Sequence, residues 1–110
     1  MTPRFDILPV ARADIQRIAN RLGRERSGLG RRFLAAFRRD CDRVARMPGI
    51  GEPLGLLDGR HPDLRVASIT KFRNFLFFYR PIHSGIEVVR VRHGAMDAES
   101  LLQHEAEGPE

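Results

Sequence analysis

The chain has 110 residues, of which 42% are hydrophobic and 30% charged, with a formal net charge of +5. Its length suits one domain, residues 1–110, and its composition is not that of a disordered chain. A single cysteine excludes an internal disulfide and a cysteine-based metal cluster. No apolar run is longer than Phe75–Tyr79, which is too short to cross a membrane. We therefore expect a cytoplasmic domain without metal or cofactor, since charges among the first twenty residues also exclude a signal peptide.

Positive charge is concentrated in the first half of the chain. Residues 1–46 contain 12 basic and 5 acidic side chains, whereas residues 47–110 contain 7 basic and 9 acidic ones. A small basic domain predicts an acidic partner, either nucleic acid or an acidic protein segment. The alternative is that arginine serves here only as a solubilising cation.

The N-terminal part reads as a strand over residues 4–8 followed by a helix that Pro9 opens. Apolar side chains then recur at helical spacing, and Gly23 is placed as the C-terminal cap. The apolar stripe consists of Ala11, Ile15, Ile18 and Leu22. The residues expected off this stripe are Arg12, Asp14, Arg17 and Arg21.

A second helix follows after a few residues, with Ser27 as its expected N-terminal cap. Met47-Pro48-Gly49 ends it, so the two helices should form an antiparallel hairpin. Its apolar stripe begins at Leu29 or Gly30 and continues through Phe33, Phe37, Cys41 and Val44. Cys41 should therefore be a buried, inert thiol.

The second half is predicted to be mainly strand. Glycines and prolines over residues 50–63 indicate a loop, with one turn of helix near residues 54–57. Strands are expected at 64–69, 74–80 and 86–93, and Gly85 can supply a positive φ in the last turn. A short helix over 98–104 and a frayed acidic tail over 104–110 complete the prediction.

The predicted order is β-α-α-β-β-β(-α), an α+β fold with a helical hairpin packed on a mainly antiparallel four-stranded sheet. Alternation divides the strand residues between two faces. Leu76 and Phe78 should oppose Phe75, Phe77 and Tyr79. In the last strand, Val89 and Val91 should oppose Val88, Arg90 and Arg92. One face should pack on the helices, and the other should carry mixed apolar and basic side chains.

Four segments in this order resemble toxins of the RelE/ParE superfamily of type II toxin–antitoxin systems, and the ParE branch most. The resemblance covers about residues 4–103, with Met96 where an arginine is usual. The segments are Leu8-Pro9-Val10-Ala11-Arg12-Ala13-Asp14-Ile15, Met47-Pro48-Gly49-Ile50-Gly51-Glu52-Pro53, Phe77-Phe78-Tyr79-Arg80 and Arg90-Val91-Arg92-His93-Gly94-Ala95-Met96-Asp97.

The resemblance implies a toxin with one of two activities. ParE-like members poison DNA gyrase without catalysis of their own, whereas RelE-like members are ribosome-dependent mRNA endonucleases. Both kinds are neutralised by a cognate antitoxin, here expected to be ParD-like with an acidic C-terminal segment. The fold alone does not decide between the two targets.

RNA cleavage would need proton-transfer groups beside cations that hold the phosphate. The candidate catalytic residues are Tyr79, Arg80, Arg90, Arg92 and His93, with Arg65, Lys71 and Arg73 as further cations. Tyr79 and Arg80 face opposite ways, which disfavours the nuclease. The structural alternatives are a core position for Tyr79 and a strand-end position for His93.

A basic stripe on the second helix is the other candidate. Its four arginines are spaced by 7, 4 and 3 residues, with Asp40 and Asp42 beside them to relieve repulsion. It is either a solvated helix face or a docking surface for an antitoxin, gyrase or nucleic acid. The expected antitoxin- or target-binding residues are Arg32, Arg39, Arg43 and Arg46 on the helix, and Arg65, Arg80, Arg90 and Arg92 on the sheet.

Overall fold

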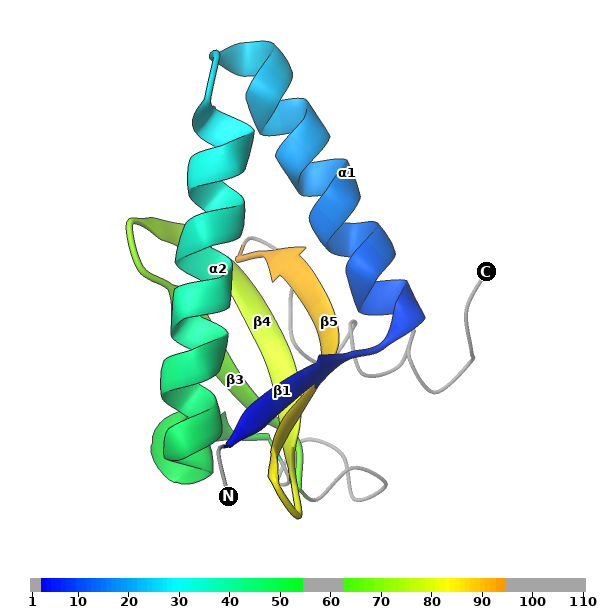
Figure 1. Cartoon of the computed structure of the whole chain (residues 1–110), viewed down its shortest axis with the longest axis vertical. Coiled ribbons are helices and arrows are strands. Elements are labelled where there is room, and N and C mark those ends of the chain that lie inside the picture. Colours follow the sequence, from blue (N-terminus) through cyan, green and yellow to red (C-terminus); the bar gives the residue numbers. More distant parts are fainter. Residues whose placement is uncertain (1–2, 55–62, 95–110) are drawn as a thin grey trace.

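The computed structural model describes residues 3–54 and 63–94. The order of elements is β1 (Arg4–Ile7), α1 (Pro9–Glu25), α2 (Leu29–Arg46), a 3₁₀ turn η1 (Pro48–Ile50), β2 (Glu52–Pro53), β3 (Arg65–Ile69), β4 (Phe72–Ile82) and β5 (Gly85–His93). Figure 1 shows the two helices joined at one end and covering one side of the sheet. The α+β fold and the helical hairpin predicted from the sequence are thus confirmed.

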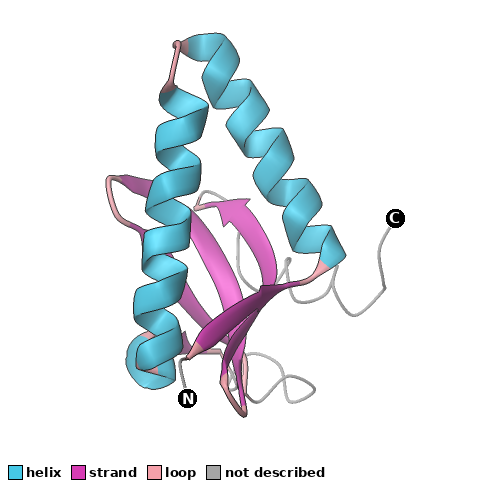
Figure 2. Cartoon of the chain, viewed as in Figure 1, coloured by secondary structure: helices cyan, strands magenta, loops and turns pink. Residues whose placement is uncertain are grey.

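The sheet has five strands rather than the predicted four, in the order β1-β5-β4-β3-β2. β1 pairs in parallel with β5, and all other neighbours are antiparallel (Figure 2). The additional strand is β2, which lies in the segment predicted as a loop. Its two residues pair with Val66 and Arg65. So short a strand, with Gly51 before it and Pro53 within it, shows no strand pattern in the sequence.

Both helices begin or end differently from the prediction. α1 continues through Gly23 to Glu25, and Gly23 does not adopt a positive φ. The cap of α2 is Gly28 at φ +82°, not Ser27, because the tight turn between the helices needs a left-handed residue. Gly85 has the positive φ expected of it.

The main core lies between the helices and the sheet. It contains the predicted stripes of α1 and α2, and Phe33 and Phe37 pack edge to face against Phe75 and Phe77 with ring centroids 5.4 and 5.7 Å apart. A smaller cluster on the opposite face consists of Leu54, Leu64, Phe78 and Val89. The predicted division of β4 residues between the two faces is therefore correct.

The division predicted for β5 is wrong. Phe78 pairs with Arg90 and Tyr79 pairs with Val88, so Val89 is the extra residue of a bulge. The bulge places Val88 and Val91 together in the main core and Val89 in the cluster on the other face.

None of the described helices combines the length and apolar composition that crossing a bilayer requires. The helical turn predicted after Leu54, the helix over residues 98–104 and the tail over 104–110 lie outside the described residues.

Candidate functional site

Tyr79 on β4 fastens the segment that connects α2 to β2. Its hydroxyl donates a hydrogen bond to the carbonyl oxygen of Pro48 at 2.7 Å and accepts one from the backbone N–H of Gly51 at 2.9 Å. Burial raises the pKa of Tyr79 above 10.0, although the Gly51 N–H and the charges of Arg65 and Arg43 act in the opposite direction. The phenol therefore stays protonated at neutral pH and is occupied as a structural donor.

Arg65 holds the same segment from β3. Its Nη1 donates to the carbonyl oxygens of Gly51 at 2.7 Å and Gly49 at 3.2 Å. Gly51 sits so close to the sheet that an added Cβ would lie 2.5 Å from the Tyr79 hydroxyl and 2.7 Å from the carbonyl oxygen of Val66. Residues 48–51 are thus fixed by side chains from two strands.

The connection that follows α2 displays two apolar side chains to solvent. Met47 is 64% exposed and Ile50 is 48% exposed, and they are the exposed large hydrophobic residues within the described chain. Arg43 and Arg46 precede them on the last turn of α2. An apolar site bordered by arginines is typical of a surface that binds an apolar and acidic partner.

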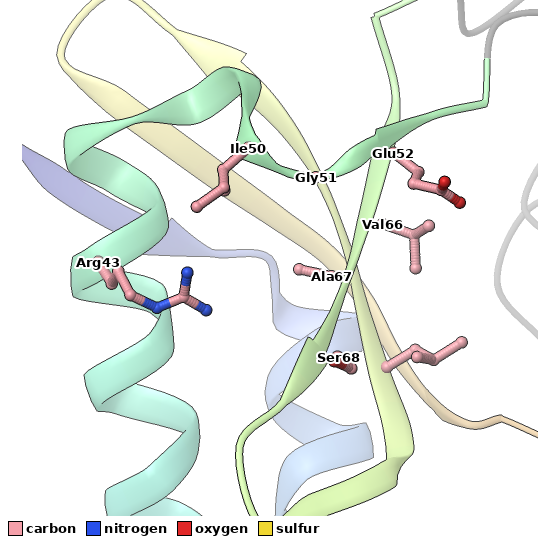
Figure 3. A pocket seen from close by; sticks show the side chains of 8 residues that line it. Arg43, Ile50, Gly51, Glu52, Val66, Ala67 and Ser68 are labelled. Atoms are coloured by element: carbon pink, nitrogen blue, oxygen red, sulfur yellow. The ribbon is translucent and has the colours of Figure 1, made fainter.

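A pocket of about 450 Å³ lies beside this segment, at the edge of the sheet. Figure 3 shows Arg43 directed toward it from α2, with Ile50 above and Ala67 on β3 facing it. Val66, Ser68 and Leu76 complete its wall on the strand side. The pocket therefore has a cation, Arg43, on its helix side, and apolar side chains together with Ser68 and Glu52 on its strand side.

The basic stripe of α2 is exposed along its length. Arg43 pairs with Asp40 at 3.3 Å and Arg46 pairs with Asp42 at 3.2 Å, so both carboxylates relieve the repulsion as predicted. Arg32 and Arg39 form no ion pair with any residue that the structure describes. Within the stripe, these two side chains are therefore the more readily available ones for binding an anion.

The sequence predicts an exposed position for Arg90, but the residue is buried and only 6% of it is accessible to solvent. Its Nε lies 2.8 Å from Oδ2 of Asp14 on α1, and its Nη2 lies 3.2 Å from Oδ1. Asp14 itself is 1% exposed, so its predicted position off the apolar stripe is wrong. The charge pair is a contact between α1 and the sheet rather than a contact for a ligand.

The five candidate nuclease residues are not brought together. Tyr79 lies in the main core, and Arg80 is half-buried beside Glu87 at 3.3 Å. His93 is at the opposite end of the β4–β5 ladder, edge to face with Phe75 at 5.2 Å. Phe75 and Arg80 are five residues apart on β4, which is about 16 Å along a strand. Arg92 is half-buried and acts on the Asp14 carboxylate through its charge.

Two buried aspartates on the helices, Asp40 and Asp14, bind backbone N–H groups of the sheet region, which the sequence analysis does not predict. Asp40 accepts hydrogen bonds from the backbone N–H of Thr70 at 2.6 Å and from its Oγ1 at 3.0 Å. Asp14 accepts one from the backbone N–H of Val91 at 3.0 Å. Each acid lies at helical spacing from apolar stripe residues, Asp14 three after Ala11 and Asp40 three after Phe37, and this spacing was the available signal.

The remaining candidates are placed as follows. Lys71 is exposed in the turn between β3 and β4, where it has φ 69°, and Arg73 is exposed at the start of β4. Cys41 is buried, and desolvation raises the pKa of its thiol, so it is an unreactive core residue as predicted. Within the described residues, no three His, Cys, Asp or Glu side chains are grouped so that they could bind a metal ion.

Comparison with known proteins gives one clear result. Residues 5–98 match the family model described as ParE toxin of the type II toxin–antitoxin system, parDE. No curated protein matches the chain significantly. The match spans far more than half of the sequence and agrees with the observed helical hairpin on a mostly antiparallel sheet. The chain therefore belongs to the ParE toxin family of type II toxin–antitoxin systems.

Proposed function

We propose that this toxin acts by binding DNA gyrase and trapping the enzyme while its DNA is cleaved, with no reaction catalysed by the toxin itself. The family implies an antitoxin partner, and we propose that a ParD-like antitoxin with an acidic segment neutralises the toxin.

The observation that carries the proposal is that two of the candidate nuclease residues, Tyr79 and Arg90, already bond to other parts of the protein. The Tyr79 hydroxyl is bonded to Pro48 and Gly51, and the Arg90 guanidinium is bonded to Asp14. A general base and a phosphate-binding cation must be able to reach the substrate. Since these groups already have buried partners, the alternative of a RelE-like mRNA endonuclease is less well supported.

The arginines that are exposed on α2 or half-buried on the sheet supply the binding surface in this proposal. The contacts are Arg32, Arg39, Arg43 and Arg46 on α2, with Arg65, Arg80 and Arg92 from the sheet. Arg90 is left out of this surface because it is buried. Arginine-rich surfaces attract acidic partners over long distances and speed the encounter, so binding should weaken as salt increases.

The test is a pair of reactions with the purified toxin. One contains gyrase and supercoiled plasmid, and the other contains translating ribosomes and mRNA. Linear plasmid after detergent and protease treatment, with intact mRNA, supports the proposal. Codon-positioned mRNA cuts with unchanged plasmid would establish the endonuclease instead.

A charge-reversal variant refines this test. Replacing Arg32→Glu and Arg39→Glu removes the two stripe arginines that have no ion pair among the described residues, and linear plasmid should fall by about tenfold or more. The control variant replaces Arg21→Glu and Arg24→Glu on α1, which changes the net charge equally. An equal loss in both variants would contradict a specific contribution of the α2 stripe.

A further inference from the structure

The solvent side of α2 carries six exposed arginines. Because an α-helix turns by about 100° per residue, the six fall within an arc of about 140°. This arc lies opposite Phe37 and Val44, which the helix buries in the main core. We name this surface the outer face of α2. Its arginines are Arg31, Arg32, Arg38, Arg39, Arg43 and Arg46.

The arginines of this face follow nearly the whole length of the helix. Figure 1 shows α2 as one unbroken helix along the side of the molecule. At a rise of 1.5 Å per residue, Arg31 and Arg46 are about 22 Å apart along the axis. Duplex DNA carries one negative charge per ~1.7 Å of its own axis, so a stretch of this length matches roughly a dozen phosphates.

The cations stand on both flanks of the face. Arg31 and Arg38 lie on the flank next to α1, since each lines a pocket to which both helices contribute. Arg32 and Arg39 lie on the other flank, and the exposed Ala35 lies between the two flanks. The major groove of B-form DNA is about 12 Å wide and admits an α-helix. A helix with a small residue in the middle and cations on both sides can therefore reach the phosphates of both strands.

Acidic side chains neutralise only part of this charge. Arg43 pairs with the buried Asp40 at 3.3 Å, and Arg46 pairs with Asp42 at 3.2 Å. The other four arginines form no ion pair with any residue in the described part of the chain. A guanidinium group donates two parallel hydrogen bonds to phosphate oxygens, so these four are suited to a phosphate backbone.

The outer face of α2 lacks exposed large apolar side chains. Across residues 3–54 and 63–94, the exposed large hydrophobic residues are Met47 and Ile50, and both follow the end of α2. Protein partners are anchored by a desolvated apolar centre, whereas protein–DNA interfaces are more polar and much more positively charged. Charge complementarity therefore favours duplex DNA over an acidic polypeptide as the occupant of this face.

We propose that the outer face of α2 binds duplex DNA directly, through its phosphates and without reading the base sequence. Phosphate contacts position a protein on the duplex but carry no sequence information. The inference goes beyond the function proposed above, because the toxin alone binds DNA and needs no gyrase for it. When gyrase is present, the same face contacts the DNA that the enzyme holds.

The test measures binding of full-length toxin to a fluorescent duplex of about 20 base pairs at several salt concentrations. Each phosphate contact contributes about −0.9 to the slope of log K against log salt, so four contacts predict a slope of about −3.6 or steeper. A duplex of unrelated sequence should bind within about twofold. A polyglutamate peptide of about 20 residues should compete at least about tenfold less well, since its charge density is lower than that of the duplex.

Two variants test the assignment to α2. Arg32→Gln with Arg39→Gln should make the slope shallower by about 2 and weaken binding at about 100 mM salt by about tenfold or more. The control is Arg4→Gln with Arg21→Gln, which removes the same charge from exposed positions on β1 and α1 and should keep the wild-type slope. All four positions are exposed, so both variants should fold. Amide shifts of isotope-labelled toxin on adding the duplex should centre on α2.

Several outcomes would overturn the proposal. These are no binding of the duplex, an unchanged slope after Arg32→Gln with Arg39→Gln, an equal loss in the control, equal competition by polyglutamate, or amide shifts centred on the sheet. The titrations contain no gyrase. Duplex binding without linear plasmid in the gyrase reaction would therefore refute the gyrase proposal alone, and linear plasmid without duplex binding would refute DNA binding by α2 alone.

Discussion

The guanidinium of Arg90 on β5 lies 2.8 Å from the carboxylate of Asp14 on α1, and both side chains are buried. β1 pairs with β5 only as far as Val88. Past that point α1 lies along β5, and Asp14 also accepts the backbone N–H of Val91. The Asp14 carboxylate thus accepts a hydrogen bond from a part of β5 that β1 does not reach, and it connects α1 to the sheet.

Replacing Asp14→Asn should destabilise the fold strongly. The substitution removes the negative charge that the guanidinium groups of both Arg90 and Arg17 contact, and breaking a buried charge pair typically costs about 3–5 kcal/mol. The free energy of unfolding in urea measures this loss. Asp42→Asn is the control, because Asp42 pairs with Arg46 on the surface and should contribute less than about 1 kcal/mol. Similar losses in the two variants would show that the buried pair has no special weight.

The same carboxylate should make stability depend on acid pH. Burial acts to raise the pKa of Asp14, but the hydrogen bonds from Arg90 and Val91 and the charges of Arg90 and Arg92 outweigh it, so the pKa lies below its ordinary value of 3.8. Because the folded pKa is below the unfolded one, this stabilisation is present above the unfolded pKa and is lost as pH falls through the folded pKa.

Urea unfolding of wild type and Asp14→Asn at several pH values tests this relation. The difference in unfolding free energy should stay constant from about pH 7 to about pH 5 and shrink below about pH 4. A difference that is unchanged in strong acid, or that shrinks between neutral pH and about pH 6, would contradict the assignment to Asp14.

The close approach of Gly51 to the sheet predicts a contrast between two nearby glycines. Gly51→Ala would place a Cβ against the Tyr79 hydroxyl and the Val66 carbonyl oxygen, so it should destabilise by about 1–3 kcal/mol. Gly49→Ala meets no atom within 4 Å and should be nearly neutral. Thermal unfolding of the two variants measures the contrast, and equal midpoints would show that residues 48–51 are not held against Tyr79.

Tyr79→Phe should release the same segment without emptying the core. The ring remains packed beside Phe77, at a centroid distance of 5.8 Å, but Pro48 and Gly51 lose their bonds to the hydroxyl. We expect a loss of about 1–3 kcal/mol and faster exchange of the Gly51 amide. Exchange of the Val88 amide at an unchanged local rate is the internal control, and an unaltered Gly51 amide would contradict the role given to Tyr79.

Patterns of apolar spacing were sufficient to predict the hairpin and the long strands. The helical stripe through Phe33, Phe37 and Cys41 and the alternation from Phe75 to Tyr79 identify buried faces directly. Such patterns depend on each element alone, so they hold wherever burial follows one regular period.

The features that sequence patterns missed arise between elements. The bulge at Val89 shifts the period of β5 by one residue, and no local signal marks it. Spacing alone places Asp14 off the apolar stripe, because its partner, Arg90, is 76 residues away in the sequence. The sequence likewise predicts a surface position for Arg90, since charge alone does not distinguish an exposed arginine from a buried, paired one.

The most direct test of the proposed mode of action follows DNA and mRNA in one bacterial culture after the toxin is induced. Binding to gyrase should produce chromosome breaks within minutes while mRNA stays uncut, and co-expression of a neutralising antitoxin should prevent the breaks. Cuts at codon positions in mRNA, with an intact chromosome, would contradict action on gyrase and would require catalysis by groups other than the bonded Tyr79 hydroxyl and the buried Arg90.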